Sequence, residues 1–227
     1  MILAIIQARM SSTRLPGKVL MPIMSKPMLL QQVERIKRSK LVDKVIVATS
    51  CGESDRPIIE FCEQNKIDCW RGPLYDVLTR VYGATIVYNS DIVIRLTGDC
   101  PLTCPDVIDK LLEFFIQEHK LDYLGNTTVG RGWPDGLDVE IMTFRCLEQA
   151  WKQAEISDDR EHVTSYIYKS GLFKCFGPLF YHKPFKTKLS VDTQEDFNRV
   201  SKIFETLYLK NPEFGLKEII EYLEGMN

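Results

Sequence analysis

The chain has 227 residues, enough to bury roughly three quarters of the surface of its unfolded state in one core. Hydrophobic residues make up 44%, charged residues 26%, and the formal net charge is −2, a balance typical of soluble globular proteins and unlike that of a general nucleic-acid binder. No apolar run approaches the about 20 residues of a membrane span. We also expect no signal peptide, because Gln7 and Arg9 directly follow the first apolar run.

Seven cysteines and three histidines are spread along the chain without a C-x-x-C pair or the spacing of a metal site. An odd number of unpaired cysteines does not indicate a disulfide framework. We therefore expect reduced, largely buried thiols and a cytoplasmic protein.

The first half of the chain alternates short apolar runs with longer segments of helical periodicity. Strands are predicted at Ile2–Gln7, Lys44–Thr49, Asp68–Arg71 and Asp91–Leu96, and helices at Pro27–Arg38, Asp55–Asn65, Tyr75–Tyr88 and Pro105–His119. This alternation predicts right-handed βαβ units and a parallel sheet covered on both faces. In such sheets ligands bind outside the carboxyl ends of the strands, so the residues after each strand are site candidates.

The pattern changes from about Leu121, where several glycines and Pro134 interrupt the chain. The alternating run Asp135–Phe144 then predicts a strand with Asp138 and Glu140 on one face and apolar residues on the other. The other predicted elements are helices at Thr143–Glu155, Arg160–Ser170, Thr193–Leu209 and Leu216–Leu223, and a strand within Phe173–Tyr181. We find no repeat and no linker long enough to separate two domains.

The segment after the first predicted strand is rich in cations and hydroxyls: Arg9, Ser11, Ser12, Thr13, Arg14 and Lys18. Backbone N–H groups and basic side chains at such a strand end can converge on an anion. Arginine can grip phosphate oxygens with two bonds, and lysine acts as a point charge. Neither G-x-x-x-x-G-K-[ST] nor G-x-G-x-x-G is present. A polyphosphate-binding loop and a solvated basic loop both remain open.

Two aspartates follow short apolar runs, Asp99 in "TGDCPL" and Asp192 in "SVDTQEDF". Either carboxylate could reach a Mg²⁺ ion bound to phosphates. Alternatively, Asp99 could be a turn residue that bonds its own backbone, and Asp192 with Glu195 has the spacing of a helix capping box. One basic loop and two acidic strand ends together are what metal-dependent nucleotidyl transfer requires.

These segments resemble the cytidylyltransferases that make CMP-activated acidic sugars, the CMP-Kdo and CMP-sialic acid synthetase family. "QARMSSTRLPGKVL" resembles the A-R-x-x-S-x-R-x-P-x-K signature of that family, "TGDCPL" its G-D-x-P-L turn, and "VDTQEDF" its V-D-T-x-E-D element. "WRG" with "DVLTR", "PDGLDVEI" and "REHVTSYIY" resemble the branch named after the spore coat polysaccharide biosynthesis protein F. The resemblance runs over nearly the whole chain.

The resemblance implies a Rossmann-like three-layer α/β/α nucleotide-diphospho-sugar transferase fold, whose mostly parallel sheet has an antiparallel excursion in the second half. It implies a homodimer that uses Mg²⁺ to transfer CMP from CTP to a sugar or acidic-sugar acceptor, with release of pyrophosphate, in polysaccharide or surface glycan biosynthesis. We expect a single domain over 1–227: a nucleotide-binding part (1–120), an acceptor and dimer part (121–185), and a part with the metal aspartate and the C-terminal helices (186–227).

Carried over residue by residue, the resemblance assigns Arg9, Lys18, Asp99 and Asp192 to catalysis, and Asp99 and Asp192 to Mg²⁺. The implied nucleotide set is Ala8, Arg9, Ser11, Ser12, Thr13, Arg14, Lys18, Arg71 and Asp99. The implied acceptor set is Asp135, Asp138, Glu140, Arg160, Glu161 and His162. Alternatives stay open, because Asp138 and Glu140 could protect an edge strand, His162 could be a hydrogen-bonded helix residue, and Asp76 with Arg80 could form a surface pair.

Three other functions are considered. The chain could act on a non-sugar acceptor such as a polyol phosphate or phosphonate, be a glycosyltransferase, or be a nucleotide-binding relic without turnover. The sequence Asp99-Cys100-Pro101 is not the D-x-D motif usual in glycosyltransferases, which counts against the second. The presence of every loop cation and both acidic turns counts against the third.

Overall fold

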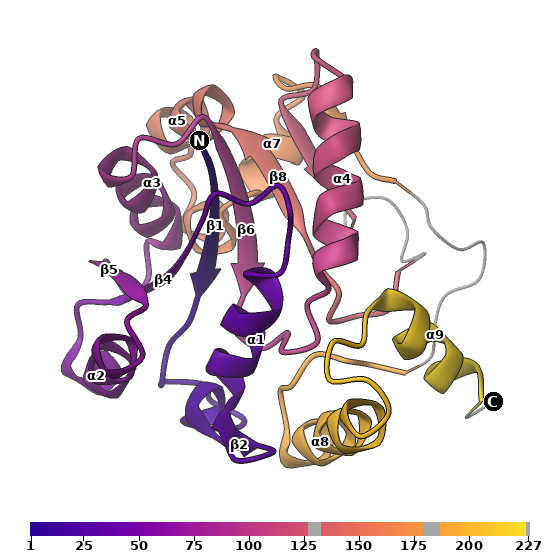
Figure 1. Ribbon diagram of the computed structural model, residues 1–227. Helices are drawn as coiled ribbons and strands as arrows, with labels where there is room; N and C mark the ends of the chain where they lie inside the picture. Colours follow the sequence, from indigo (N-terminus) through magenta and orange to yellow (C-terminus); the bar gives the residue numbers. More distant parts are fainter. Residues whose placement is uncertain (127–132, 179–186, 226–227) are drawn as a thin grey trace.

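The computed structural model describes residues 1–126, 133–178 and 187–225. Its centre is a sheet with the strand order β5-β4-β1-β6-β8-β7-β9 (Figure 1). The strands are β1 (Ile2–Gln7), β4 (Lys44–Ser50), β5 (Asp68–Gly72), β6 (Ile92–Thr97), β7 (Tyr123–Gly125), β8 (Glu140–Thr143) and β9 (Cys175–Phe176). Strands β5, β4, β1 and β6 are parallel, and β8 is antiparallel to both β6 and β7. The predicted mostly parallel sheet with an antiparallel excursion is confirmed.

Helices cover both faces of the sheet (Figure 1). They are α1 (Met28–Ile36), α2 (Arg56–Gln64), α3 (Val77–Val87), α4 (Pro105–Gln117), α5 (Phe144–Gln153), α6 (Ser157–His162), α7 (Ser165–Lys169), α8 (Gln194–Tyr208) and α9 (Leu216–Glu224). Buried residues of α1, α2, α4, α8 and α9 form one apolar layer, and those of α3, α5 and α7 form the other. Because side chains alternate along β1, Ala4 and Ile6 join the first layer, whereas Leu3 and Ile5 join the second.

One short hairpin was not predicted. It consists of β2 (Pro22–Ile23) and β3 (Lys26–Pro27), which pair antiparallel. The two residues between them, Met24 and Ser25, have φ angles of 50° and 67°. Two successive positive φ angles are typical of the tight turns that join hairpin strands, which usually carry Asn or Gly. No residue of that kind marks this turn in the sequence.

The strand predicted at Asp135–Phe144 is shorter in the structure, where β8 begins at Glu140. Gly136 has a φ of +101°, and a Cβ atom there would lie 2.4 Å from the backbone of Leu189 and Ser190. The segment before β8 therefore packs closely against the chain near residue 190 instead of extending the sheet. Asp135 and Asp138 lie in this irregular segment and not on a strand face.

The helix predicted at Arg160–Ser170 is two helices, because the chain turns between α6 and α7. Val163 has φ 60° and ψ −60°, and the N–H of Thr164 donates to the carbonyl of His162 at 2.6 Å. These values describe a γ-turn of the rare, strained kind. The strand predicted within Phe173–Tyr181 is limited to β9, and its last residues lie outside the described part of the chain.

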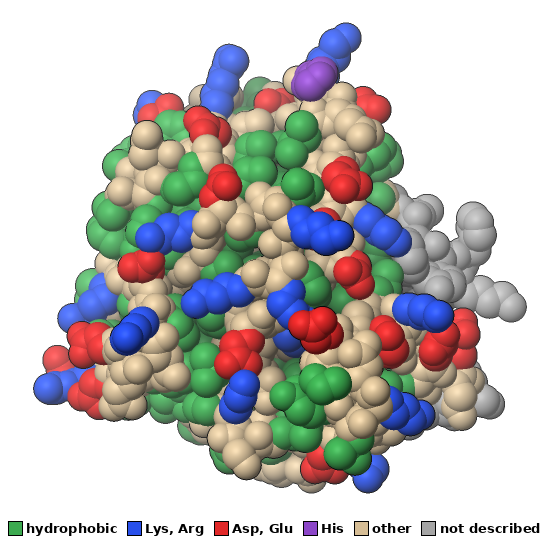
Figure 2. Space-filling view, in the orientation of Figure 1, with side chains coloured by type: hydrophobic (Ala, Val, Ile, Leu, Met, Phe, Trp, Pro, Cys, Tyr) green, Lys and Arg blue, Asp and Glu red, His purple; other side chains and the backbone are tan. Residues whose placement is uncertain are grey.

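In the described ranges, no helix combines the length and apolar character needed to cross a bilayer. All seven cysteines are free thiols, and Cys62, Cys100, Cys104 and Cys146 are buried. Figure 2 shows Lys, Arg, Asp and Glu side chains interspersed over the face seen in Figure 1. Charges of both signs therefore alternate over this face.

Candidate active site

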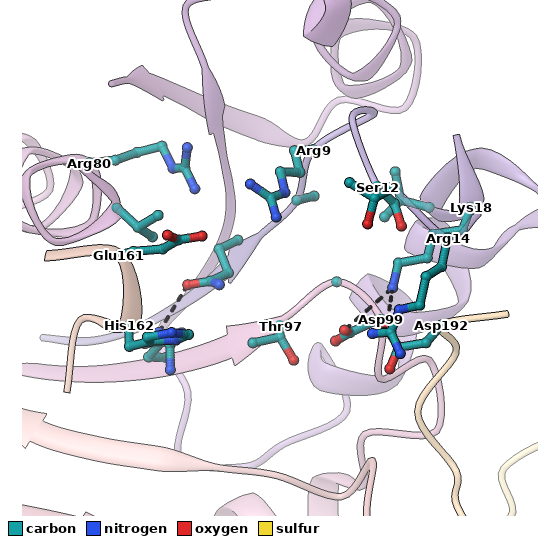
Figure 3. Close-up of a pocket in the computed structure, with 17 residues that line it drawn as sticks. Arg9, Ser12, Arg14, Lys18, Arg80, Thr97, Asp99, Glu161, His162 and Asp192 are labelled. Atoms are coloured by element: carbon teal, nitrogen blue, oxygen red, sulfur yellow. Dashed lines mark hydrogen bonds and ion pairs between the residues drawn. The ribbon is translucent and has the colours of Figure 1, made fainter. Parts of the chain in front are cut away.

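A cavity of about 370 Å³ opens at the carboxyl ends of β1 and β6. Its lining comprises Gln7, Ala8, Arg9, Ser12, Thr13, Arg14, Lys18, Val19, Val77, Arg80, Arg95, Thr97, Gly98, Asp99, Glu161, His162 and Asp192. Figure 3 shows Arg14, Lys18, Asp99 and Asp192 at one end, and Arg80, Glu161 and His162 at the other, with Arg9 between them. The position agrees with the rule that ligands of such sheets bind at the carboxyl ends of the strands.

The loop after β1 is shaped by backbone bonds at both of its ends. The buried carboxylate of Asp55 accepts the N–H of Met10 at 2.7 Å and the N–H of Ser50 at 3.2 Å, which ties the start of the loop to the end of β4. Gly17 has a φ of +72°, which glycine adopts without steric cost, and its N–H donates to the Met10 carbonyl at 2.9 Å. The loop closes at Gly17, and Lys18 turns back toward the pocket.

The ammonium group of Lys18 lies between the two predicted metal carboxylates. Its Nζ is 3.5 Å from Asp99 Oδ2 and 3.0 Å from Asp192 Oδ1, and it donates to the Val191 carbonyl at 2.5 Å. Only 9% of the Lys18 side chain is exposed. Arg14 Nη2 lies 2.9 Å from Asp192 Oδ1. The basic loop and the two acidic segments therefore meet in one cluster.

Two backbone contacts bring Asp99 and Asp192 together although they are far apart in the sequence. The N–H of Val191 donates to the carbonyl of Asp99 at 2.8 Å. A Cβ atom on Gly98 would lie 3.0 Å from the Gln7 carbonyl, so the turn after β6 packs tightly against the end of β1. The glycine in "TGD" therefore has a packing role, and the Val191 bond aligns the second carboxylate beside the first.

Asp192 is held as a carboxylate by its neighbours. Lys188 Nζ lies 2.7 Å from Asp192 Oδ2. Burial raises the pKa of Asp192, but the hydrogen bonds from Lys188 and Lys18 outweigh it, so the pKa is lowered. Asp192 is therefore ionised at neutral pH.

The donor set fits a hard divalent cation. Two carboxylates already share one cationic group, the Lys18 ammonium, and oxygen ligands are those that Mg²⁺ prefers. Among the described residues no group of three or more acidic, His or Cys side chains could hold a metal ion. A Mg²⁺ ion held by Asp99 and Asp192 would therefore take its other ligands from phosphate and water, as is usual for this ion.

The capping box of α8 uses other residues than the sequence spacing suggested. The N–H of Asp196 donates to Thr193 Oγ1 at 3.2 Å, and the N–H of Thr193 donates to Asp196 Oδ2 at 3.0 Å. The alternative in which Asp192 and Glu195 form the box is therefore wrong. Asp192 lies one residue before the cap, and its side chain points into the cluster with Lys18.

We expect Asp196→Asn to lower the free energy of unfolding by about 1–2 kcal/mol at pH 7, because a cap and charged partners are lost. Burial raises the pKa of Asp196, but hydrogen bonds from Lys188 and Arg199 lower it well below its usual range. The stabilisation is thus complete above the unfolded-state pKa of about 3.9 and is lost as the pH falls below it. Urea unfolding between pH 2 and pH 7 should show that the free energy of unfolding falls less steeply with decreasing pH in the variant than in the wild type. Glu195→Gln, at an exposed position, is the control and should show the wild-type pH dependence. A free energy of unfolding that falls as steeply with decreasing pH in Asp196→Asn as in the wild type would contradict this prediction.

The other end of the pocket contains a buried arginine. Arg80 is 2% exposed, donates from Nη1 to the Pro73 carbonyl at 3.0 Å, and makes no ion pair with any described residue. Burial lowers the pKa of Arg80 to about 10. The suggested surface pair with Asp76 does not form, since Asp76 caps α3 through the N–H of Thr79 at 2.9 Å.

The structure separates the predicted acceptor set. Glu161 and His162 line the pocket, whereas Asp135, Asp138, Glu140 and Arg160 do not. Arg160 binds Asp76 Oδ2 at 2.8 Å and the Ala154 carbonyl at 2.7 Å, so it links α6 to α3 and α5. Asp135 accepts a hydrogen bond from Ser190 Oγ at 2.9 Å. Arg160 and Asp135 are thus bound to groups of the protein outside the pocket lining, and their assignment to the acceptor stays a prediction.

Glu140 is buried at 8% exposure, and β8 lies between β6 and β7. The alternative that its charge protects an edge strand is therefore wrong. In the nucleotide set, Ser11 and Arg71 do not line the pocket, and Arg71 Nη2 donates to the Cys51 carbonyl at 3.0 Å. The pocket geometry therefore does not support the assignment of Ser11 and Arg71 to the nucleotide, which stays a prediction.

Several pocket residues were missed by the sequence reasoning, chiefly Gln7, Arg80 and Arg95. The sequence contained features that could have identified Gln7 and Arg95. Gln7 ends the apolar run of β1, and Arg95 is a charge inside the apolar run of β6. A charge in a buried strand requires a partner, so Arg95 could have been selected for that reason. Arg80 had no such signal, because a charged residue in a helix is usually at the surface.

A cation-rich loop after the first strand of a doubly covered sheet, facing two carboxylates, is the arrangement that metal-dependent nucleotidyl transfer requires. A family model described as cytidylyltransferase matches residues 3–227, and the chain belongs to this family. The predicted family and enzyme class are confirmed.

Relatives match over nearly the full chain. An uncharacterized protein of Methanocaldococcus jannaschii is 38% identical over 226 residues, covering 98% of this chain and 90% of that protein. The spore coat polysaccharide biosynthesis protein SpsF of Bacillus subtilis is 30% identical over 234 residues, covering 98% and 93%. A solved cytidylyltransferase from Leptospira borgpetersenii superposes with a TM-score of 0.89 at 31% identity, covering 99% of this chain and 94% of that one.

Proposed function

We propose that this chain transfers CMP from CTP to a hydroxyl of a sugar or acidic-sugar acceptor and releases pyrophosphate. The observation that carries the proposal is the position of Lys18 Nζ between Asp99 and Asp192, beside Arg14. Cations for a triphosphate and carboxylates for a divalent ion thus share one end of a pocket. The similarity to SpsF supports a sugar acceptor and a role in polysaccharide or surface glycan biosynthesis.

In this reaction the acceptor oxygen forms a bond to the α-phosphorus of CTP, and the bond from that phosphorus to the bridging oxygen breaks, so that pyrophosphate leaves. Arg9, Arg14 and Lys18 offset negative charge on the phosphates. Asp99 and Asp192 would hold Mg²⁺, which when bound supplies Lewis-acid stabilisation of that charge.

The binding of CTP requires a change of partners at Lys18. Its ammonium group is already paired with Asp99 and Asp192, and it can exchange these carboxylates for phosphate oxygens. At the opposite end of the pocket, Glu161 and His162 are the ionisable groups that could accept the proton of the acceptor hydroxyl.

The test measures pyrophosphate release with CTP, ATP, GTP or UTP, Mg²⁺ and a panel of acceptors: acidic sugars, neutral sugars, polyol phosphates and phosphonates. We expect release with CTP and a sugar or acidic sugar. Release only with a polyol phosphate or phosphonate would contradict the sugar acceptor and favour the first alternative. Binding of CTP with Mg²⁺ in calorimetry, without release for any acceptor, would favour a nucleotide-binding relic. Sugar transfer from a nucleoside diphosphate sugar would indicate a glycosyltransferase.

The proposal includes a homodimer, which the resemblance to the family implies. Sedimentation analysis across a range of protein concentrations tests it directly. A single species of 26.2 kDa at all concentrations would contradict it.

A further inference from the structure

Glu140 is a buried carboxylate that joins three separate elements next to the pocket. Its Oε2 is paired with Nη1 of Arg95 on β6. Its Oε1 accepts hydrogen bonds from the hydroxyl of Tyr123 on β7 at 2.7 Å and from Oγ1 of Thr164, after α6, at 2.6 Å. Glu140 does not line the pocket, but two of the segments it binds do.

The first of these segments carries Arg95, which lines the pocket. Its side chain is 11% exposed, and its Nε donates to Oε1 of Gln7, another lining residue, at 2.9 Å. A guanidinium inside an apolar strand is costly to bury unless it is paired, and Glu140 is its ion-pair partner. The carboxylate thus fixes the direction of a cation that forms part of the pocket wall.

The second segment is the γ-turn at Val163, which directly follows the lining residues Glu161 and His162. Val163 is fully buried, and a positive φ is an outlier for a β-branched residue. Strained backbone persists where the surroundings determine it, and it is concentrated at functional sites. Here the bond from Thr164 Oγ1 to Glu140 holds the residue that closes the turn.

We propose that Glu140 is a positioning residue. Through one carboxylate it orients Arg95 and holds the Val163 turn, so that Arg95, Glu161 and His162 form one wall of the pocket. This wall contacts the acceptor, and Arg95 is a further substrate-contacting residue. The inference rests on the proposed function and adds residues to it.

The charges of the two ends favour the acceptor as the ligand of this wall. Arg14 and Lys18 lie at the opposite end, with Asp99 and Asp192 (Figure 3). Arg80 lies at this end as well, and the Glu161 carboxylate beside it can accept hydrogen bonds from hydroxyl groups. Together with the donors of Arg95, it suits a ligand that carries both hydroxyls and an electron-rich group.

The central variant is Glu140→Gln, which keeps the size of the side chain and an oxygen for Tyr123 and Thr164 but removes the charge that pairs with Arg95. We expect kcat/KM for the acceptor to fall by about 10- to 100-fold, the usual effect of losing a residue that orients a ligand-binding group. Calorimetry should show a CTP affinity close to that of the wild type. Asp109→Asn is the control, because Asp109 accepts the N–H of Lys40 at 3.0 Å and lies outside the pocket lining.

A second variant separates positioning from stability. Glu140→Gln leaves Arg95 buried and unpaired, so the protein should melt at a lower temperature. Glu140→Gln combined with Arg95→Gln removes the unpaired charge, and the melting temperature should rise again. We expect turnover to stay low in the double variant, because the contact from Arg95 to the acceptor is missing. Recovery of turnover together with stability would overturn the proposal and leave Glu140 a purely structural role.

Hydrogen exchange tests the turn without any acceptor. We expect Thr164→Val, which removes the bond to Glu140, to exchange faster than the wild type over residues 160–168. Asp109→Asn should exchange at the wild-type rate. If the wild-type protein binds CTP but no acceptor gives pyrophosphate, the proposed function fails, and this measurement still decides on Glu140. Unchanged exchange in Thr164→Val, or a CTP affinity of Glu140→Gln that falls as far as its kcat/KM, would overturn the inference.

Discussion

Lys18→Ala is expected to lower the rate of pyrophosphate release from CTP by about 10²-fold or more, as the loss of a preorganised charge typically does. The Lys18 side chain is 9% exposed, and its ammonium group lies between Asp99 and Asp192. Among the described residues, Lys18 is the one lysine of the pocket lining, and the other cations of the lining are arginines. The measurement is steady-state pyrophosphate release with saturating CTP and Mg²⁺.

Two further variants show whether the loss comes from the charge. Lys18→Met keeps the length of the apolar stem and should lose as much activity as Lys18→Ala. Lys26→Ala removes a lysine that pairs with Glu34 at 2.7 Å on the surface, and it should leave turnover unchanged. Asp192 retains Lys188 and Arg14 when Lys18 is replaced, so the fold should persist. Near-normal pyrophosphate release by Lys18→Met would contradict the assignment of Lys18 to catalysis.

Asp99→Asn is expected to have an effect of similar size, about 10²-fold or more, and to raise the Mg²⁺ concentration needed for half-maximal rate. Asparagine keeps the shape of the side chain but provides one neutral oxygen in place of a carboxylate. The Val191 N–H bond to residue 99 involves the backbone carbonyl, so the substitution leaves it intact. The measurement is the rate of pyrophosphate release as a function of Mg²⁺ concentration.

The control for this variant is Asp43→Asn, at the opposite end of the sheet. Asp43 Oδ2 accepts the N–H of Ile2 at 2.7 Å, at the amino end of β1. It should change stability slightly and leave the Mg²⁺ dependence as it is in the wild type. An Asp99→Asn protein with an unaltered Mg²⁺ dependence would show that Asp99 does not bind the ion.

Much of the fold could be predicted because burial on both faces makes parallel strands read as continuous apolar runs. β1 begins and ends at the predicted residues for this reason. The break at Val163 could not be predicted, because valine normally avoids positive φ and the turn depends on tertiary contacts: the burial of Val163 and the bond from Thr164 to Glu140. The turn at Met24 and Ser25 was not predicted either, because neither residue is typical of turns with positive φ.

The site was predictable where position alone decides the geometry. Residues directly after β1 and β6 had to lie at one edge of the sheet, so Lys18 and Asp99 could be selected as neighbours. The alternation of side chains along a strand, in contrast, predicts on which face of the sheet a residue lies, but not which segments pack against that face. Glu140 was placed on the polar face of its strand, but its side chain is buried there. Its partners Arg95, Tyr123 and Thr164 come from three other segments of the chain.

The bond between Val191 and Asp99 has a consequence for when the pocket is completed during synthesis of the chain. The loop after β1 and the Asp99 turn both precede Asp192 along the chain, so both are synthesised before it. A nascent chain that already contains β1 and β6 therefore lacks the second carboxylate. We expect such a chain to lack the paired carboxylates that the proposed CMP transfer requires, so the site is completed only when the segment with Asp192 docks on Asp99.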